Sequence, residues 1–165
     1  MSDTQPDQFS IEEEFDDFIN VPLIRAARRL QLHFYKTALM PLDLSIQEWR
    51  TLLNLKKLGD THLRELARFG HLDPTHVSRV AVQLEKRGLI KRYNDPQDSR
   101  RKRLAITNDG SQLVSHIWPS AKALTQAVRN ELGETQYGAL QQALATILEA
   151  DTFMNDPDGP ALAAE

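Results

Sequence analysis

The segment from Asp73 to Arg103 constrains this chain most, because it concentrates positive charge in an otherwise acidic sequence. It holds nine Lys or Arg residues against four acids, a local net charge of +5, whereas the 165-residue chain has a formal net charge of -3. Both flanks are acidic: residues 1–20 contain seven acids and residues 134–165 contain six, and neither range contains Lys or Arg. The basic segment therefore calls for an anionic partner, and we expect the acidic ends to lie away from it.

Composition bounds the class of protein. A hydrophobic content of 41% and a charged content of 26% are ordinary for a globular domain, and the length allows a buried core. The absence of cysteine excludes disulfides and thiolate metal sites, and it fits a cytoplasmic protein. Residues 1–20 lack the basic and apolar regions of a signal peptide, and no apolar run is long enough to span a membrane. We therefore expect a cytoplasmic location and no membrane contact.

Apolar residues at helical spacing predict an amphipathic helix over about 13–39. A second helix should begin after Ser45, which has Glu48 three residues on as the partner of a capping box, and should end at Gly59. A short helix is predicted over 62–69.

A tight turn at 70–72 separates that short helix from the next one. Asp73 has the right chemistry for an N-cap and Pro74 for the first helical position, where a missing N–H does no harm. The helix should run to about Arg87 and stop at Gly88. Two helices joined by a tight turn are the arrangement of a helix-turn-helix.

Helical angles divide the residues of the second of these helices into two faces. One face is apolar and consists of Val77, Val80, Ala81 and Leu84. The opposite face is polar and consists of Thr75, His76, Arg79, Gln83 and Lys86. A helix that enters the major groove of duplex DNA needs a packed back and a polar, cationic front, and its first turn reaches the base edges. This reasoning selects Thr75, His76 and Arg79, with Ser78 at the flank, although an ordinary solvated face, His76 included, gives the same pattern.

A basic hairpin follows. Residues 89–93 read as a strand, 94–98 as a turn and 101–107 as a return strand, with Arg100 to Arg103 forming a run of four cations. A slender cationic ribbon of this kind can enter or straddle a minor groove. Thr107 should then cap a long helix that Gly133 breaks before a last helix begins.

Four stretches of the sequence carry a resemblance to a known family. They are LRELA at 63–67, DPTHVSR at 73–79, LEKRGLI at 84–90 and Asp98-x-Arg100-x-x-x-Leu104-x-Ile106-Thr107-x-x-Gly110. Together they resemble the MarR family of winged helix-turn-helix transcriptional regulators, and the last is the most specific. The resemblance implies a mainly α fold with a small β-hairpin wing, in which a winged helix-turn-helix lobe is joined to a helical dimerisation base.

The composition of the two ends predicts a disordered acidic tail at 1–12 and a flexible tail at 154–165. Between them, the resemblance implies a dimerisation region at 13–39 and 108–153 and a DNA-binding lobe at 40–107. The implied function is that of a homodimeric repressor that binds a pseudo-palindromic operator in double-stranded DNA. Thr75, His76, Ser78 and Arg79 would then face the major groove and Arg100 the minor groove. Phosphate contacts would come from Lys86, Arg101 and Arg103.

Many members of the family release DNA when a small molecule, often an anionic aromatic compound, binds between the base and the lobe. For such an effector the candidates in this sequence are Arg25, Arg29, His33 and Trp49. The first three recur every fourth residue and share one helix face, which suits a carboxylate. A solvated basic face, or one paired with acids of a partner chain, explains them equally, and Trp49 also fits a core position.

No enzyme class is indicated. The sequence has no glycine-rich phosphate loop, no cysteine nucleophile and no His-Glu metal motif, so we expect no catalytic residue and no cofactor. The five histidines do not pair at the spacing of helical metal ligands, and we expect no metal site.

The alternative function is a winged-helix architectural or protein-interaction module without an effector, for which DNA binding would be weak and indifferent to sequence.

Overall fold

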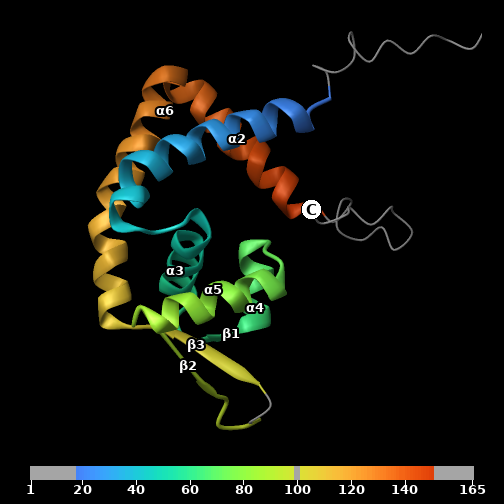
Figure 1. Cartoon of the computed structure of the whole chain (residues 1–165). Coiled ribbons are helices and arrows are strands. Elements are labelled where there is room, and N and C mark those ends of the chain that lie inside the picture. Colours follow the sequence, from blue (N-terminus) through green and yellow to red (C-terminus); the bar gives the residue numbers. More distant parts are fainter. Residues whose placement is uncertain (1–17, 99–100, 151–165) are drawn as a thin grey trace, which may run out of the picture. The chain divides into compact units, whose positions relative to one another are not determined.

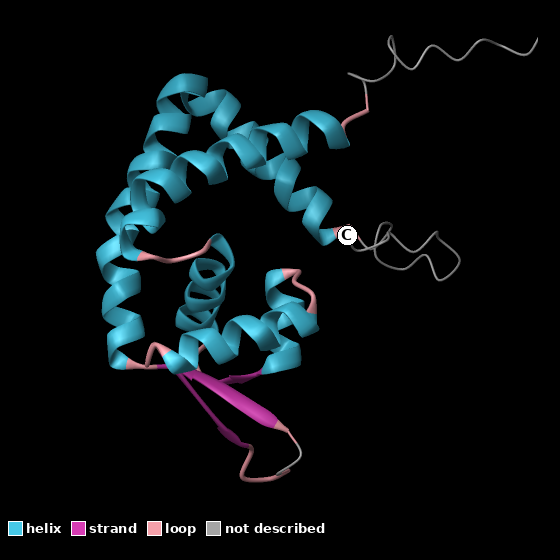
Figure 2. Cartoon of the chain, in the orientation of Figure 1, coloured by secondary structure: helices cyan, strands magenta, loops and turns pink. Residues whose placement is uncertain are grey.

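The computed structural model describes residues 18–98 and 101–150 of the chain, which forms two compact units (Figure 1). The first unit extends to Lys122 and the second begins at Ala123. The tails predicted at 1–12 and 154–165 lie outside the described residues, as do Ser99 and Arg100. Most of the described chain is helical, with one small sheet (Figure 2).

The predicted helix over 13–39 corresponds to α2, Asn20–Phe34, followed by a π-helical turn at Tyr35–Leu39 and a 3₁₀ turn at Met40–Leu42. Pro22 is the third residue of α2 and lies in its first turn, where no intrahelical donor is needed, so it does not break the helix. Residues 13–17 of the predicted helix lie outside the described range.

Helix α3, Ile46–Leu58, begins with the predicted capping box. The Glu48 backbone N–H donates to Ser45 Oγ at 3.1 Å, and the Ser45 backbone N–H donates to Glu48 Oε2 at 2.9 Å. The Glu48 side chain is buried and also pairs with Arg87, whose Nη1 lies 3.1 Å from Glu48 Oε1. The Glu48 carboxylate thus caps the N-terminus of α3 and links α3 to Arg87, which follows the helix Pro74–Lys86.

The helix-turn-helix consists of α4, Leu63–Gly70, and α5, Pro74–Lys86. His71 has a left-handed backbone (φ 47°) that makes the turn, and the last carbonyl of α4, that of Gly70, accepts a hydrogen bond from Arg50 Nη2 at 3.1 Å. Asp73 is the N-cap of α5 and Pro74 its first residue, as predicted. The predicted apolar stripe of α5 is buried, with exposed fractions of 4% or less for Val77, Val80, Ala81 and Leu84.

The wing comprises β2, Ile90–Asn94, β3, Lys102–Ile106, and the turn between them. The two strands are antiparallel, with Tyr93 opposite Arg103. A third strand, β1, Thr61–His62, pairs with the other side of β3, so the sheet order is β1-β3-β2. The sequence prediction missed β1, because two residues are too few to show an alternating pattern.

The close packing around Gly110 explains why the wing motif ends in glycine. A Cβ at this position would lie 2.1 Å from the Leu89 carbonyl oxygen, well inside van der Waals contact. The Thr107 backbone N–H donates to the same oxygen at 3.1 Å, and Thr107 Oγ1 caps the following helix by accepting from the Gly110 backbone N–H at 3.1 Å. The close approach of α6 to the start of β2 therefore requires a residue without a side chain.

Helix α6 spans Asn108–Glu149 and is interrupted at Gly133, which has φ 73° and ψ 162°. This break was predicted, and the backbone conformation is one that residues with a Cβ rarely adopt. Within the second unit, the Arg129 guanidinium lies 4.6 Å from the centre of the Tyr137 ring. The fold class is therefore confirmed, whereas the division into dimerisation and DNA-binding regions stays a prediction.

Replacing Glu48 with Ala should test the double role of this carboxylate. We expect the free energy of unfolding to fall by about 2–3 kcal/mol, because the variant loses an N-cap interaction and leaves Arg87 without its carboxylate partner. Urea unfolding followed by circular dichroism at one fixed protein concentration measures the change. Glu131→Ala, at an exposed position, is the control, with an expected change within about 0.5 kcal/mol. Equal losses for the two variants would contradict this account of Glu48.

Candidate nucleic-acid interface

The first turn of α5 is held by its N-cap and exposes polar side chains. Asp73 Oδ2 accepts a hydrogen bond from the His76 backbone N–H at 2.6 Å, which fixes the start of the helix. Thr75, His76 and Arg79 are exposed, and Ser78 is half-buried. Because the opposite stripe is buried in the core, α5 cannot rotate about its axis without exposing apolar side chains. The side chains predicted to read bases therefore lie together on the outer face of the lobe.

The cations of α5 differ in whether they have a partner within the protein. Among the described residues, neither Arg79 nor Lys86 forms an ion pair or a side-chain hydrogen bond, and both are exposed. Arg87 is engaged: its guanidinium donates to the carbonyl oxygens of Leu42 and Asp43 at 3.2 and 2.7 Å as well as to Glu48. Arg79 and Lys86 are thus available to an outside anion, whereas Arg87 holds the lobe together.

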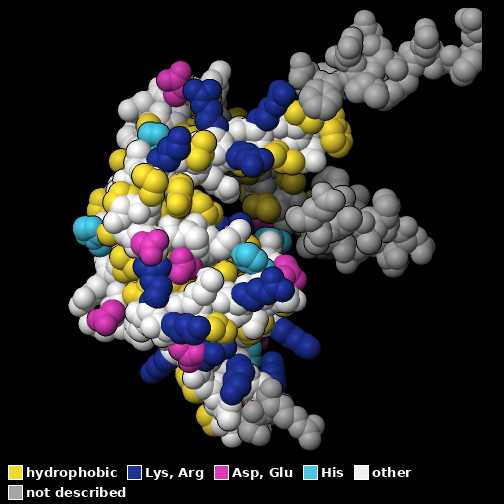
Figure 3. All heavy atoms as spheres, in the orientation of Figure 1, with side chains coloured by type: hydrophobic (Ala, Val, Ile, Leu, Met, Phe, Trp, Pro, Cys, Tyr) yellow, Lys and Arg dark blue, Asp and Glu magenta, His cyan; other side chains and the backbone are white. Residues whose placement is uncertain are grey.

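Lys and Arg side chains are spread over the face formed by α5 and the wing (Figure 3). Arg100, the predicted minor-groove residue, lies outside the described residues. Arg101 and Lys102 are exposed, and with His62, Leu63 and Arg64 they line a cavity of about 440 Å³ between the start of α4 and the wing. No acidic side chain lines this cavity within the described residues, so it suits a phosphate group.

Arg103 differs from its neighbours because its guanidinium is paired within the protein. Its Nε lies 3.0 Å from Asp60 Oδ1 and its Nη1 lies 3.4 Å from Asp95 Oδ2. His62 Nε2 lies 3.0 Å from the same oxygen of Asp95, and the Tyr93 hydroxyl donates to Asp60. This geometry favours a structural role for Arg103 over the phosphate contact predicted from the sequence.

Hydrogen bonds lower the pKa of several carboxyls in this region. The pKa of Asp95 falls because its side chain accepts from the Gln97 backbone N–H, and that of Glu65 falls because it accepts from Thr61. A hydrogen bond from Arg92 lowers the pKa of Glu85. For Asp60, burial raises the pKa, but hydrogen bonds from Tyr93 and Arg103 outweigh it and the pKa is lowered. All four groups are therefore stabilised as carboxylates by the folded lobe.

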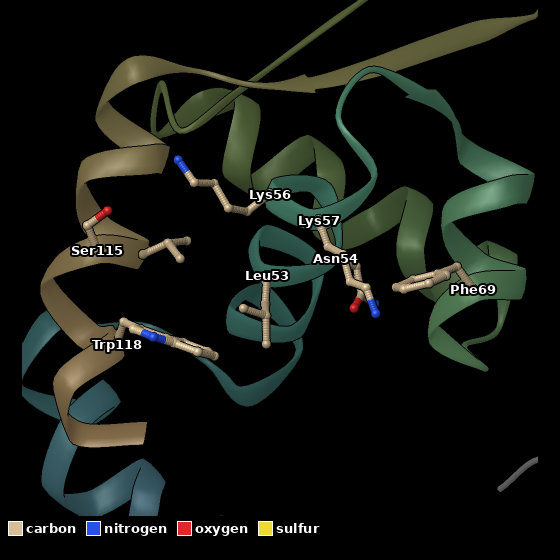
Figure 4. A pocket seen from close by; sticks show the side chains of 8 residues that line it. Leu53, Asn54, Lys56, Lys57, Phe69, Ser115 and Trp118 are labelled. Atoms are coloured by element: carbon tan, nitrogen blue, oxygen red, sulfur yellow. The ribbon is translucent and has the colours of Figure 1, made fainter. Parts of the chain in front are cut away.

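A second cavity, of about 640 Å³, lies in the first unit (Figure 4). Residues of α3, of α4 and of the first turns of α6 line it: Leu53, Asn54, Lys56, Lys57, Phe69, Val114, Ser115 and Trp118. Lys56 Nζ donates to Ser111 Oγ, and Lys57 Nζ lies 5.0 Å from the centre of the Phe69 ring. Apolar walls, two ammonium groups and no acid suit an anionic aromatic compound.

None of the four side chains predicted to bind an effector lines this cavity. Trp49 is 6% exposed and its ring lies 5.6 Å from that of Phe34, so it occupies a core position. Arg25, Arg29 and His33 are exposed on α2. No sequence pattern pointed to Phe69 or Trp118, because an aromatic residue on an amphipathic helix is expected to be buried. In the structure these two side chains are 39% and 46% exposed.

The part of the chain that the structure describes contains no cluster of three His, Asp or Glu side chains that could hold a metal ion. No helix among the described residues is both long and apolar enough to cross a membrane.

Comparison with known proteins agrees with this geometry. The model of the MarR family matches residues 44–102, which include α3, the helix-turn-helix and most of the wing. The HTH-type transcriptional regulator FarR of Neisseria gonorrhoeae is 26% identical over 137 residues, which cover 83% of this chain and 93% of FarR. The resemblance inferred from the wing and helix motifs is thereby confirmed.

Solved structures show the same fold. That of Bordetella bronchiseptica BpsR, whose DNA binding is regulated by 6-hydroxynicotinic acid, has a TM-score of 0.75 and 25% identity and covers 89% of this chain and all of the BpsR chain. A mutant of Escherichia coli MarR in complex with operator DNA has a TM-score of 0.73 and 18% identity, with coverage of 82% and 97%.

The lowered carboxyl pKa values predict how stability depends on pH. A group whose pKa is lower in the folded state stabilises the fold above its unfolded pKa, here the ordinary 3.8 of Asp and 4.5 of Glu, and this contribution is lost as pH falls through the folded value. We expect the urea midpoint to drop as pH is lowered through 4.5 and 3.8. Asp95→Asn should flatten the drop. An unaltered profile for Asp95→Asn would contradict the role of this carboxylate.

Proposed function

We propose that this chain, a transcriptional regulator that belongs to the MarR family, is a homodimeric repressor that binds a pseudo-palindromic operator and releases it when an anionic aromatic effector binds. The observation that carries the DNA-binding part is the outer face of α5. Its cation Arg79 is exposed and has no partner among the described residues, while the back of the helix is buried. Guanidinium groups in this position bind guanine edges bidentately.

We assign the predicted contacts to two classes. Thr75, His76, Ser78 and Arg79 are proposed to face base edges, because they lie on the first two turns of α5. Lys86 and Arg101 are proposed to contact phosphates, and Arg64 and Lys102 join them through the basic cavity beside the wing. Arg100 keeps its proposed minor-groove role on the strength of the family motif alone.

The homodimer is supported by exposed apolar side chains in both units, each taken by itself. On the first unit, four apolar side chains in α2 or just before it are 51–65% exposed: Phe18, Ile19, Ile24 and Leu32. On the second, the last turns of α6 expose Leu140, Leu144, Ile147 and Leu148. A monomer would leave this surface in water, whereas a second copy of the chain would cover it, and a two-fold dimer matches a palindromic site. Since the proposed target is operator DNA, the proposal includes a cytoplasmic location.

The effector is assigned to the cavity between α3, α4 and α6. Its volume of about 640 Å³ is within the range of small-molecule sites, and Lys56 and Lys57 supply positive charge beside the Phe69 and Trp118 rings. The relative BpsR responds to 6-hydroxynicotinic acid, an aromatic acid of the class that such a cavity would take. Because the cavity joins the helix-turn-helix to α6, a ligand there is placed to shift the lobe.

Arg79→Ala should weaken binding to the cognate operator by about 1–3 kcal/mol and relax specificity, because it removes a contact to a base. Lys86→Ala is the matched comparison, and it should weaken binding to operator and random duplex alike. The slope of log affinity against log salt concentration should also become shallower, by about the amount expected for one phosphate contact. Fluorescence anisotropy with DNA from upstream of the protein's own gene, at several salt concentrations, separates the two. If Arg79→Ala keeps the wild-type ratio of operator to random affinity, the major-groove assignment is wrong.

Lys57→Met should weaken binding of an aromatic acid at least about tenfold while preserving operator binding without ligand, because it removes a charge from the cavity and none from the face of α5. Isothermal titration with a panel of hydroxylated benzoic and nicotinic acids provides the measurement. Arg29→Met removes a charge from α2 instead, and it should leave ligand affinity unchanged. The reverse result would place the effector on α2, where the sequence first suggested it.

A further inference from the structure

Arg103 lies in the middle of a row of polar side chains that crosses the sheet. It is opposite His62 on β1 and opposite Tyr93 on β2, and residues opposite each other in a sheet point to the same face. Leu104, the next residue, points to the other face and is fully buried in the core. The row therefore occupies the face of the sheet that does not pack on the helices.

The guanidinium of Arg103 connects two parts of the chain that are distant in sequence. On one side it contacts Asp60, in the segment between α3 and β1, through Oδ1 at 3.0 Å and through the backbone oxygen at 3.0 Å. On the other side it contacts Asp95, the first residue of the wing turn, at 3.4 Å. Tyr93 adds a hydrogen bond to Asp60. Arg103 thus joins the helical part of the lobe to the tip of the wing.

Asp95 in turn shapes the wing turn. Its Oδ1 accepts from the Gln97 and Asp98 backbone N–H groups at 2.7 and 3.3 Å, and its own N–H donates to the Arg101 carbonyl at 2.9 Å. Its side chain is only 8% exposed. The conformation of the described part of the turn, and with it the position of Arg101, therefore depends on a carboxylate that Arg103 holds in place.

We propose that Asp60 and Arg103 are positioning residues that hold the wing in its DNA-binding pose, and that Arg103 makes no contact with DNA. The inference rests on the proposed DNA-binding function. Two carboxylates face the one guanidinium, so this group offers no net positive charge to a phosphate. Arg103 instead restricts the conformations of the wing in the free protein. The wing then loses less conformational entropy when it binds DNA.

A positioning role for Asp60 and simple electrostatics predict opposite changes in DNA affinity when Asp60 is neutralised. Asp60 is an acid beside a basic surface, so neutralising it would strengthen DNA binding if charge alone mattered, and would also free Arg103 for a phosphate. If Asp60 holds the wing, Asp60→Asn must weaken binding instead. Tyr93→Phe, which removes only the hydroxyl donor to Asp60 and changes no charge, must weaken it as well.

The test uses the full-length protein with Asp60→Asn, Tyr93→Phe and the matched control Asp43→Asn, which removes an exposed acid from a left-handed position that Asn tolerates. We expect operator Kd to rise about three- to tenfold for Asp60→Asn, less for Tyr93→Phe, and not at all for the control. In the protein without DNA, hydrogen exchange of the backbone amides of Asp95, Gln97, Asp98 and residues 101–103 should become faster in Asp60→Asn, while amides at 77–84 keep their wild-type rates.

Unchanged or tighter operator binding by Asp60→Asn would overturn the proposal, and so would unchanged exchange in the wing. Faster exchange across 77–84 too would mean that Asp60 only stabilises the whole lobe, which also overturns it. Failure of the proposed function shows itself separately, because wild-type protein would then bind operator and random duplex equally. The exchange measurement does not involve DNA, so it still decides whether Asp60 orders the wing.

Discussion

Burial of one stripe of α5 is the constraint on which the rest of the lobe depends. Val77, Ala81 and Leu84 are fully buried, and Val80 is nearly so. Burying such side chains stabilises a domain by about 1.5–3 kcal/mol for each large one, so rotating the helix would cost several of these contributions. The outward direction of Thr75, His76 and Arg79 is a consequence of this packing, and no contact made by these polar side chains themselves is needed to maintain it.

The basic segment 73–103 contains two groups of cations, which differ in whether they are paired within the protein. Arg87, Arg92 and Arg103 form ion pairs with carboxylates of the same lobe. These pairs attach α5 to α3, the wing to α5, and the wing to the segment before β1. Arg79 and Lys86 have no partner among the described residues and remain available to an outside anion. The local net charge of +5 therefore overstates the charge offered to DNA, because part of it is neutralised where it holds the fold together.

Helix α3 takes part in both proposed sites. Its last turns contribute Lys56 and Lys57 to the cavity, and the chain that leaves it reaches Asp60, which holds Arg103, within three residues. Its first turn carries Glu48, which pairs with the end of α5. A displacement of α3 would thus be felt at both elements proposed to contact DNA. The end of α5 is attached to α3, and the wing to the segment that follows α3, by charged hydrogen bonds whose geometry is restrictive.

The helices, their caps, the wing strands and the faces of α5 could be predicted from the amino-acid order alone, because they follow from periodicity and from side chains that contact their own neighbours in the chain. Ser45 with Glu48, Asp73 with His76, and Gly133 are such local cases. The folded structure was needed to identify the paired cations, the position of the cavity and the packing of Trp49 on Phe34. Asp60 and Arg103 are 43 residues apart, and no local pattern shows that a fold brings an acid to a given arginine. Partners of that kind are set by packing between distant elements, and they distinguish Arg103, which is paired within the lobe, from Arg79, which is exposed and has no partner among the described residues.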